Sequence, residues 1–171
     1  MSQFTGSNDY LDGRKPVPTA ESAHQVLSTR FTLAMATADL DINDIGAIAI
    51  LPAGHVPVDC RVDGSDMDSS TAALIFKVGI GNLALKDAAG AVSADAKDTL
   101  ISTVAADGGG AWGDSGAAVN VAFDRDLTRT LNNMNAVTAV NYDRHIVAQV
   151  QAAPTTAVAG TLGLTLFYRP A

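Results

Sequence analysis

The closing stretch of the chain decides its fold class. Residues 145–150 read HIVAQV, residues 151–160 read QAAPTTAVAG, and residues 161–170 read TLGLTLFYRP. The outer two segments are apolar at alternate positions and the middle one is a bend of small residues, which together indicate two β-strands flanking a turn-rich connection. Pro170 has no N–H and cannot extend a hydrogen-bonded ladder. We therefore predict that the chain ends on a strand that fills a place in a sheet.

The same two-residue period recurs upstream. Residues 24–37 (HQVLSTRFTLAMAT) and 55–64 (HVPVDCRVDG) alternate, whereas residues 45–51 (IGAIAIL) are apolar throughout. Further strands are expected within residues 71–80 and 117–124. The residues expected to face inward are Leu27, Thr29, Phe31, Leu33 and Met35 in the first strand, Val56, Val58, Cys60 and Val62 in the third, Leu74, Phe76, Val78 and Ile80 in the fourth, and Val119, Val121 and Phe123 in the fifth.

About eight short strands separated by turn signals are typical of all-β sandwiches and barrels. Residues 107–116, DGGGAWGDSG, are expected to form a Gly-rich loop. Residues 93–104 fit a helical turn or a strand equally well, and residues 128–143 are ambiguous. No helix of ordinary length, fixed-period repeat or dividing linker is found.

The composition is that of a single lean β-domain. The chain has 171 residues, of which 47% are hydrophobic and only 5% aromatic. Its net charge is −7, and its basic residues are scattered except for the adjacent Arg14 and Lys15. Phosphate binding needs a basic stripe, so we expect no direct nucleic-acid partner.

The first twenty residues differ from the rest. Residues 1–20 are polar and contain Gly6, Gly13, Pro16 and Pro18, which predicts an extended N-terminal arm ahead of a β-sandwich domain over residues 21–171. Phe4 and Tyr10 would be unusual in a purely disordered tail. We expect the arm to dock, either on this domain or on a partner.

The sequence also indicates a compartment. The single cysteine allows no intrachain disulfide. We find neither a secretory signal nor an apolar run of the roughly 18 residues that a membrane span requires. We expect a soluble protein made in a cytosol, with no membrane partner.

Cys60 and His55, in residues 54–60 (GHVPVDC), suggest at first a nucleophile with a base. A regular strand would place Cys60 on one face and both His55 and Asp59 on the other. We therefore interpret Cys60 as a buried apolar residue. The three histidines, which lack zinc-ligand spacing, are interpreted as surface or edge residues: His24, His55 and His145.

Two acidic clusters match the pattern of a calcium-binding loop only in part. Asp39, Asp41 and Asn43 match positions 1, 3 and 5 of an EF-hand, but Asp44 and Ile50 stand where that loop requires Gly and Glu. The second cluster, with Asp63, Asp66 and Asp68, also departs from the pattern. Turn formation explains both clusters, and a nonstandard cation site stays an alternative.

The stretch GDSG, residues 113–116, matches a serine-protease sequence only in four small residues, with no His–Asp pair to accompany it. We expect an exposed loop with Trp112 at its tip, suited to a protein contact. We therefore assign no catalytic, cofactor-binding or metal-binding residue, and no cofactor.

Two stretches resemble a known family. Residues 51–80, LPAGHVPVDCRVDGSDMDSSTAALIFKVGI, and the closing AAPTTAVAGTLGLTLFYRP, residues 152–170, are similar to capsid decoration (cement) and other auxiliary virion proteins of tailed bacteriophages. The resemblance implies a jelly-roll-like β-sandwich that assembles on the outside of an icosahedral shell, often as a trimer. It implies the major capsid protein as a partner and brings no catalytic residues.

The leading hypothesis is therefore a non-enzymatic cement protein on the virion surface, made in the host cytoplasm, that bridges capsomers. The arm would anchor it, so that deleting residues 1–18 would weaken shell binding while the fold survives. The alternatives are a tail or head-fibre component, or a carbohydrate- or calcium-binding β-sandwich using Asp39, Asp41, Asp63, Asp66 and Trp112.

Overall fold

The computed structural model describes residues 2–20, 22, 24–69, 73–81, 110–114, 129–130 and 139–171. Within this part of the chain the protein is almost entirely β-structure, and its one helical element is the short 3-10 helix η1 (Thr37–Asp39). The predicted all-β class is confirmed. The same residues include no helix with the length and apolar character to cross a membrane.

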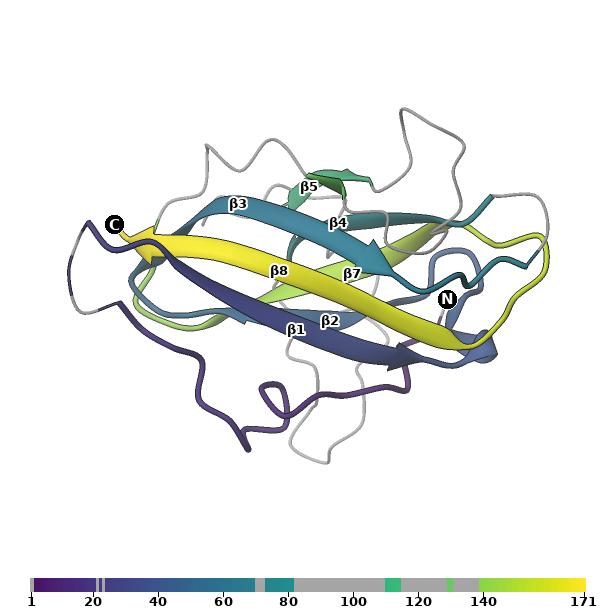
Figure 1. Ribbon diagram of the computed structural model, residues 1–171, viewed down its shortest axis with the longest axis horizontal. Helices are drawn as coiled ribbons and strands as arrows, with labels where there is room; N and C mark the ends of the chain where they lie inside the picture. Colours follow the sequence, from purple (N-terminus) through teal and green to yellow (C-terminus); the bar gives the residue numbers. More distant parts are fainter. Residues whose placement is uncertain are drawn as a thin grey trace.

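Two antiparallel sheets lie face to face (Figure 1). One sheet has the order β1-β8-β3-β6 and the other the order β2-β7-β4-β5. The strands are β1 (Leu27–Met35), β2 (Ile45–Leu51), β3 (His55–Gly64), β4 (Ile75–Gly81), β5 (Gly110–Asp114), β6 (Arg129–Thr130), β7 (Arg144–Ala152) and β8 (Gly160–Pro170).

The pairing between strands is nested. β1 pairs with β8, β2 with β7, β3 with β6 and β4 with β5, each time antiparallel. The first strand therefore meets the last, and β8 lies between β1 and β3. The two closing strands predicted from the sequence are confirmed as parts of β7 and β8, and the final strand does occupy an interior place in a sheet.

Alternation sets which side chains fill the core. Along β1 every second residue from Thr29 to Met35 is buried, and the residues between them are exposed, as predicted. The inward set predicted around β4 is also buried. β2 is buried on both faces, with only Ile50 half-buried, which agrees with its uniformly apolar sequence. Side chains from both sheets form one apolar cluster.

β3 breaks the predicted alternation. The pairing of β3 with β8 shifts by one residue between Pro57 and Asp59, so Val58 lies in a β-bulge. Val58 is 46% exposed, whereas His55 is buried at 6% exposure. Because of the extra residue, the positions before Val58 have the opposite inside–outside phase from the one expected by counting back from Cys60. The prediction that Val58 faces inward and His55 outward was wrong for this reason, while Cys60 and Val62 are buried as predicted.

The predicted Gly-rich loop is also partly a strand. Residues 110–114 form β5, which pairs with β4 at a sheet edge, so the backbone of Trp112 lies in a strand rather than at a loop tip. Of the ambiguous residues 128–143, Arg129 and Thr130 form β6. The expectations for residues 93–104 and 117–124 fall outside the described residues.

A buried carboxylate joins two connections at one end of the sheets. Asp68 is 2% exposed, and its Oδ2 accepts hydrogen bonds from the backbone N–H groups of Ala73 at 2.9 Å and Thr155 at 3.1 Å. Its Oδ1 accepts one from the backbone N–H of Thr156 at 3.1 Å. These bonds hold the connection from β3 to β4 against the bend between β7 and β8, because charge-assisted bonds to buried N–H groups are strong.

Replacing Asp68 with Asn is expected to lower the free energy of unfolding by about 1–3 kcal/mol, since the amide group would face N–H donors and leave at least one unsatisfied. Urea unfolding measures the change. The control is Asp66→Asn: Asp66 is exposed, and its Oδ1 accepts the backbone N–H of Asp68, a bond that Asn can also make. An equal loss in both variants would contradict the role given to Asp68.

Candidate functional site

The N-terminal arm, residues 2–20, lies against the body of the protein (Figure 1). It runs along the side where β1 and β2, the edge strands of the two sheets, lie next to each other. An unpaired edge strand presents free N–H and C=O groups, and proteins commonly cover such edges. The arm covers both edges at once, and we therefore take it as the candidate functional site.

The distal arm, residues 2–8, begins as an added strand on β2. Gln3 forms a parallel bridge with Ile45, and the backbone N–H of Phe4 donates to Ile45 O at 3.0 Å. Phe4 is 7% exposed and belongs to the core cluster. Its ring lies over Gly46, where a Cβ atom would stand 2.7 Å from the ring. Gly46 therefore provides the space into which the Phe4 ring packs.

Two buried carboxylates hold the same segment. Oδ1 of Asp39 accepts the backbone N–H of Thr5 at 2.9 Å, and its Oδ2 accepts the Thr5 hydroxyl at 3.0 Å. Asp39 Oδ2 also accepts the N–H of Ala36 at 2.8 Å, so one side chain caps η1 and holds the arm. Asp44 accepts a hydrogen bond from the backbone N–H of Ser2. Both aspartates are 1% exposed.

The rest of the distal arm crosses from β2 to β1. The side-chain amide of Asn8 donates to Ile48 O at 3.0 Å. Gly6 passes so close to the backbone oxygen of Ala34 that a side chain at this position would collide with it. Beyond it, the Tyr10 ring contacts the buried Phe31, with ring centroids 4.8 Å apart. The arm thus closes the side of the two-sheet body.

The proximal arm, residues 16–20, is held by a second set of buried groups. The hydroxyl of Tyr168 donates to Pro18 O at 2.6 Å and lies 2.9 Å from the Thr29 hydroxyl. Burial raises the pKa of the Tyr168 phenol, so it stays protonated and able to donate. Nε2 of His55 accepts the N–H of Ala20 at 3.3 Å, and its Nδ1 lies 2.8 Å from Ala53 O. His55 is therefore a satisfied structural histidine.

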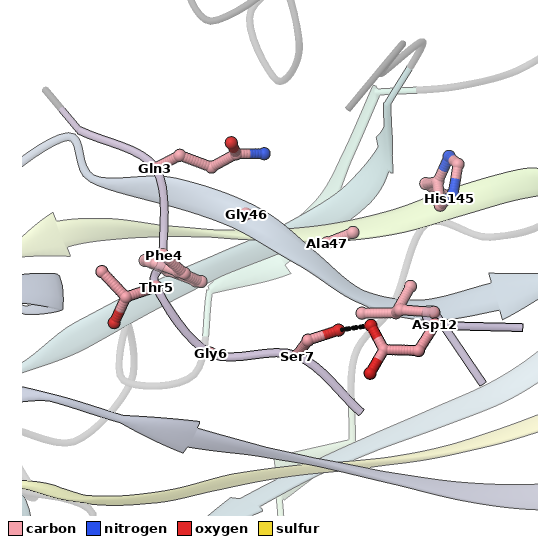
Figure 2. Close-up of a pocket in the computed structure, with 10 residues that line it drawn as sticks. Gln3, Phe4, Thr5, Gly6, Ser7, Asp12, Gly46, Ala47 and His145 are labelled. Atoms are coloured by element: carbon pink, nitrogen blue, oxygen red, sulfur yellow. Dashed lines mark hydrogen bonds between the residues drawn. The ribbon is translucent and has the colours of Figure 1, made fainter. Parts of the chain in front are cut away.

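A hollow of about 340 Å³ lies between the distal arm, β2 and β7. Figure 2 shows Gln3, Ser7 and Asp12 on the arm side and His145 on the β7 side. The Ser7 hydroxyl donates to Asp12 Oδ1, so these two polar groups satisfy each other. The lining combines small residues, the apolar Phe4 and Leu11, and the half-buried His145.

Cys60 is fully buried in the core cluster. Burial raises the pKa of its thiol, and the nearby charge of Asp59 raises it further. A thiolate is the reactive form of cysteine, so this environment suppresses nucleophilic chemistry. The backbone N–H of Cys60 donates to Oδ1 of the neighbouring Asp59 at 2.8 Å, so this carboxylate is engaged by the backbone of the strand.

The acidic residues proposed as calcium or sugar contacts are dispersed. Asp39 is buried and bound to the arm, while Asp41 is exposed. Asp63 pairs with Arg30, whose Nη2 lies 2.6 Å from Asp63 Oδ1. Asp66 accepts a bond from the backbone N–H of Asp68. Over the residues that the structure describes, no three His, Cys, Asp or Glu side chains gather as metal ligands would. The absence of catalytic and metal-binding residues stays a prediction.

The outer face of the sheet β1-β8-β3 carries ordered charges. The Arg30–Asp63 pair spans β8 above Gly163, where a Cβ atom would come within 2.6 Å of Arg30 Nη2. Arg61 lies 3.5 Å from Asp59 and over the Phe167 ring, 5.4 Å from its centroid. These contacts order the exposed side chains of this face, although exposed pairs of this kind add little to stability.

Sequence reasoning identified the arm and its two aromatic residues but not the groups that bind them. Asp39 and Asp44 looked like parts of a turn or a calcium loop, and they are instead buried anchors of the arm. The small Gly46 inside an apolar strand was the available signal, because glycine in a strand often marks a close approach of another segment.

No protein-family model and no curated protein sequence matches this chain. Solved structures of phage capsids share its fold. It is similar to a chain of the capsid of Ralstonia phage GP4, with a TM-score of 0.66, 21% identity, and coverage of 99% of this chain and 97% of that one. It is also similar to a chain of the Cyanophage Pam1 capsid asymmetric unit, with a TM-score of 0.52, 16% identity, and coverage of 92% and 94%.

Replacing Phe4 with Ala is expected to lower the free energy of unfolding by about 3 kcal/mol, because it empties a buried site between the sheets. The arm should also loosen, so that trypsin cuts faster after Arg14, since Pro16 blocks cleavage after Lys15. Urea unfolding and limited proteolysis measure the two effects. Gln3→Ala is the control, because it leaves the backbone bridge to Ile45 intact and should change stability by no more than about 0.5 kcal/mol.

Cys60 in the native protein is expected to react with iodoacetamide on the order of a hundredfold more slowly than in urea, since the buried thiol is both inaccessible and protonated. Mass spectrometry over time at neutral pH gives both rates. Rapid labelling of the native protein would show that the core around β3 opens readily.

Proposed function

We propose that this chain is a structural protein of a bacteriophage virion. The observation that carries the proposal is the likeness to a chain of the capsid of Ralstonia phage GP4, which extends over 99% of this chain. The second neighbour, from the Cyanophage Pam1 capsid, supports the same assignment over 92% of this chain.

The fold that we infer is a jelly-roll β-sandwich of eight strands. Its support is the nested pairing, which places the strands in the orders β1-β8-β3-β6 and β2-β7-β4-β5. Folding a long two-stranded ribbon over itself produces this order, and double-sheet jelly rolls are common in viral capsid proteins. We keep the division into an arm, residues 1–20, and a body, residues 21–171, as part of this proposal.

Within the virion we propose the role of a decoration (cement) protein. The chain would bind the outer surface of the major capsid protein as a homotrimer and stabilise the shell by bridging capsomers. The resemblance of residues 51–80 and 152–170 to cement proteins supports this role. A net charge of −7 would keep unassembled copies soluble in the host cytoplasm. The mechanism is buried area and multivalency, without chemistry.

The sequence predicted that the arm anchors the protein to the shell and that the fold survives without it. In this proposal the arm is also part of the folded body. Phe4 is buried in the core cluster and Asp39 binds Thr5, so deleting the arm should destabilise the body as well as any complex. The outer face of β1, β8 and β3 would be a surface for shell contact that needs no change in the arm. Its Arg30–Asp63 and Arg61–Phe167 contacts hold it in one shape.

Purified protein is expected to form a trimer by light scattering behind a sizing column, and to raise the melting temperature of shells assembled without it. Arg61→Ala, on the outer face, should weaken shell binding while leaving the trimer and its unfolding curve nearly unchanged. His24→Ala, an exposed change ahead of β1, is the control. If shells do not bind the protein and their melting temperature does not rise, the cement role is excluded and a tail or head-fibre component is favoured.

A further inference from the structure

The arm contains a compact turn between its two anchored parts. Residues 9–15 form a compact turn closed by local backbone bonds: the N–H of Asp12 donates to Asn8 O at 2.9 Å, and that of Arg14 donates to Asp9 O at 2.8 Å. Gly13 adopts a φ of +70°, which favours glycine. The turn sits between the distal arm and the proximal arm, each of which has its own buried anchors.

The distal arm binds in a groove between β1 and β2. Its contacts there would be the same if the arm and the groove belonged to two different chains. They are the ring of Phe4 over Gly46, the bonds of Thr5 to Asp39, and the backbone bonds to Ile45. Each joins residues at least 34 positions apart in sequence. An extended segment added to an edge strand, with one side chain in a pocket, is a common mode of peptide recognition between chains.

We propose that the groove between β1 and β2 is a docking site for the distal arm of a second copy, and that the turn at residues 9–15 stores the length needed for the exchange. Extended, residues 9–17 reach at most about 30 Å. Opening the turn breaks its local bonds and the contact of Tyr10 with Phe31, while the proximal arm stays on its own body through Tyr168 and His55.

Assembly supplies the driving force. The inference rests on the proposed self-association of the chain, because tethering copies side by side raises the local concentration of a neighbour's arm to the millimolar range. The exchanged and unexchanged arms make the same distal contacts, so the cost of exchange is confined to the local bonds of the turn and the contact of Tyr10 with Phe31. Exchange of an identical element is therefore a low-cost route to a closed oligomer. The exchanged arms would link the copies of one oligomer.

The direct test places a photo-crosslinking residue at Gln3 in the full chain, in separate light and heavy isotope preparations mixed before assembly. Exchange predicts that about half of the crosslinks to the peptide containing Ile45 join a light chain to a heavy one. Trimers in which every crosslink is within one chain would overturn the exchange and leave the proposed assembly intact. Monomers at every concentration, with only internal crosslinks, would overturn both.

A second test does not depend on crosslinking chemistry. Phe4→Asp prevents the arm from binding but leaves the groove intact. Gly46→Val blocks the groove with a side chain but leaves the arm intact. Mixed in equal amounts, the two variants should form a joint oligomer with a melting temperature above that of either alone. The control mixes Phe4→Asp with the double variant Phe4→Asp/Gly46→Val, which offers no intact arm and should show no gain. No gain in either mixture would contradict exchange.

Discussion

The C-terminal strand β8 is hydrogen-bonded along both of its edges, to β1 on one side and to β3 on the other. The rest of the arrangement depends on this double pairing. β1 is the first strand in the sequence and β8 is the last, so segments far apart in the sequence must meet to complete this sheet. Leu162, Leu164 and Leu166 then face the opposite sheet and contribute to the shared core. Long-range pairing of this kind is slow to form, because the loop closure precedes the contacts that stabilise it.

A sandwich built in this way leaves two edge strands, β1 and β2, exposed on one side. The arm covers them with a parallel bridge at Ile45, a ring over Gly46 and bonds to buried carboxylates. Without the arm, two free edges and an apolar opening would invite pairing between copies. The same groove thus protects a single copy and, if filled by a neighbour's arm, joins copies together.

This arrangement fits the structural role proposed above. Its one thiol is buried with a raised pKa, and His55 and several aspartates are engaged in holding backbone segments. These polar groups hold the arm and the connections between strands in place. In the proposed assembly, a body with ordered side chains on its outer face and a docked arm would present preformed surfaces and so lose less entropy on binding.

By itself, the sequence determined the all-β class, the strands β1, β2, β4, β7 and β8, and the burial of Cys60, because period-two alternation is a local property of the chain. It also marked the arm as a segment that docks. Only the tertiary structure decided the bulge at Val58, the burial of His55, the strand at residues 110–114 and the roles of Asp39 and Asp44. Each of these depends on a partner far away in sequence: β8 sets the register of β3, and the arm converts two turn-like aspartates into buried anchors. Local patterns carry no information about which distant segment will supply that partner.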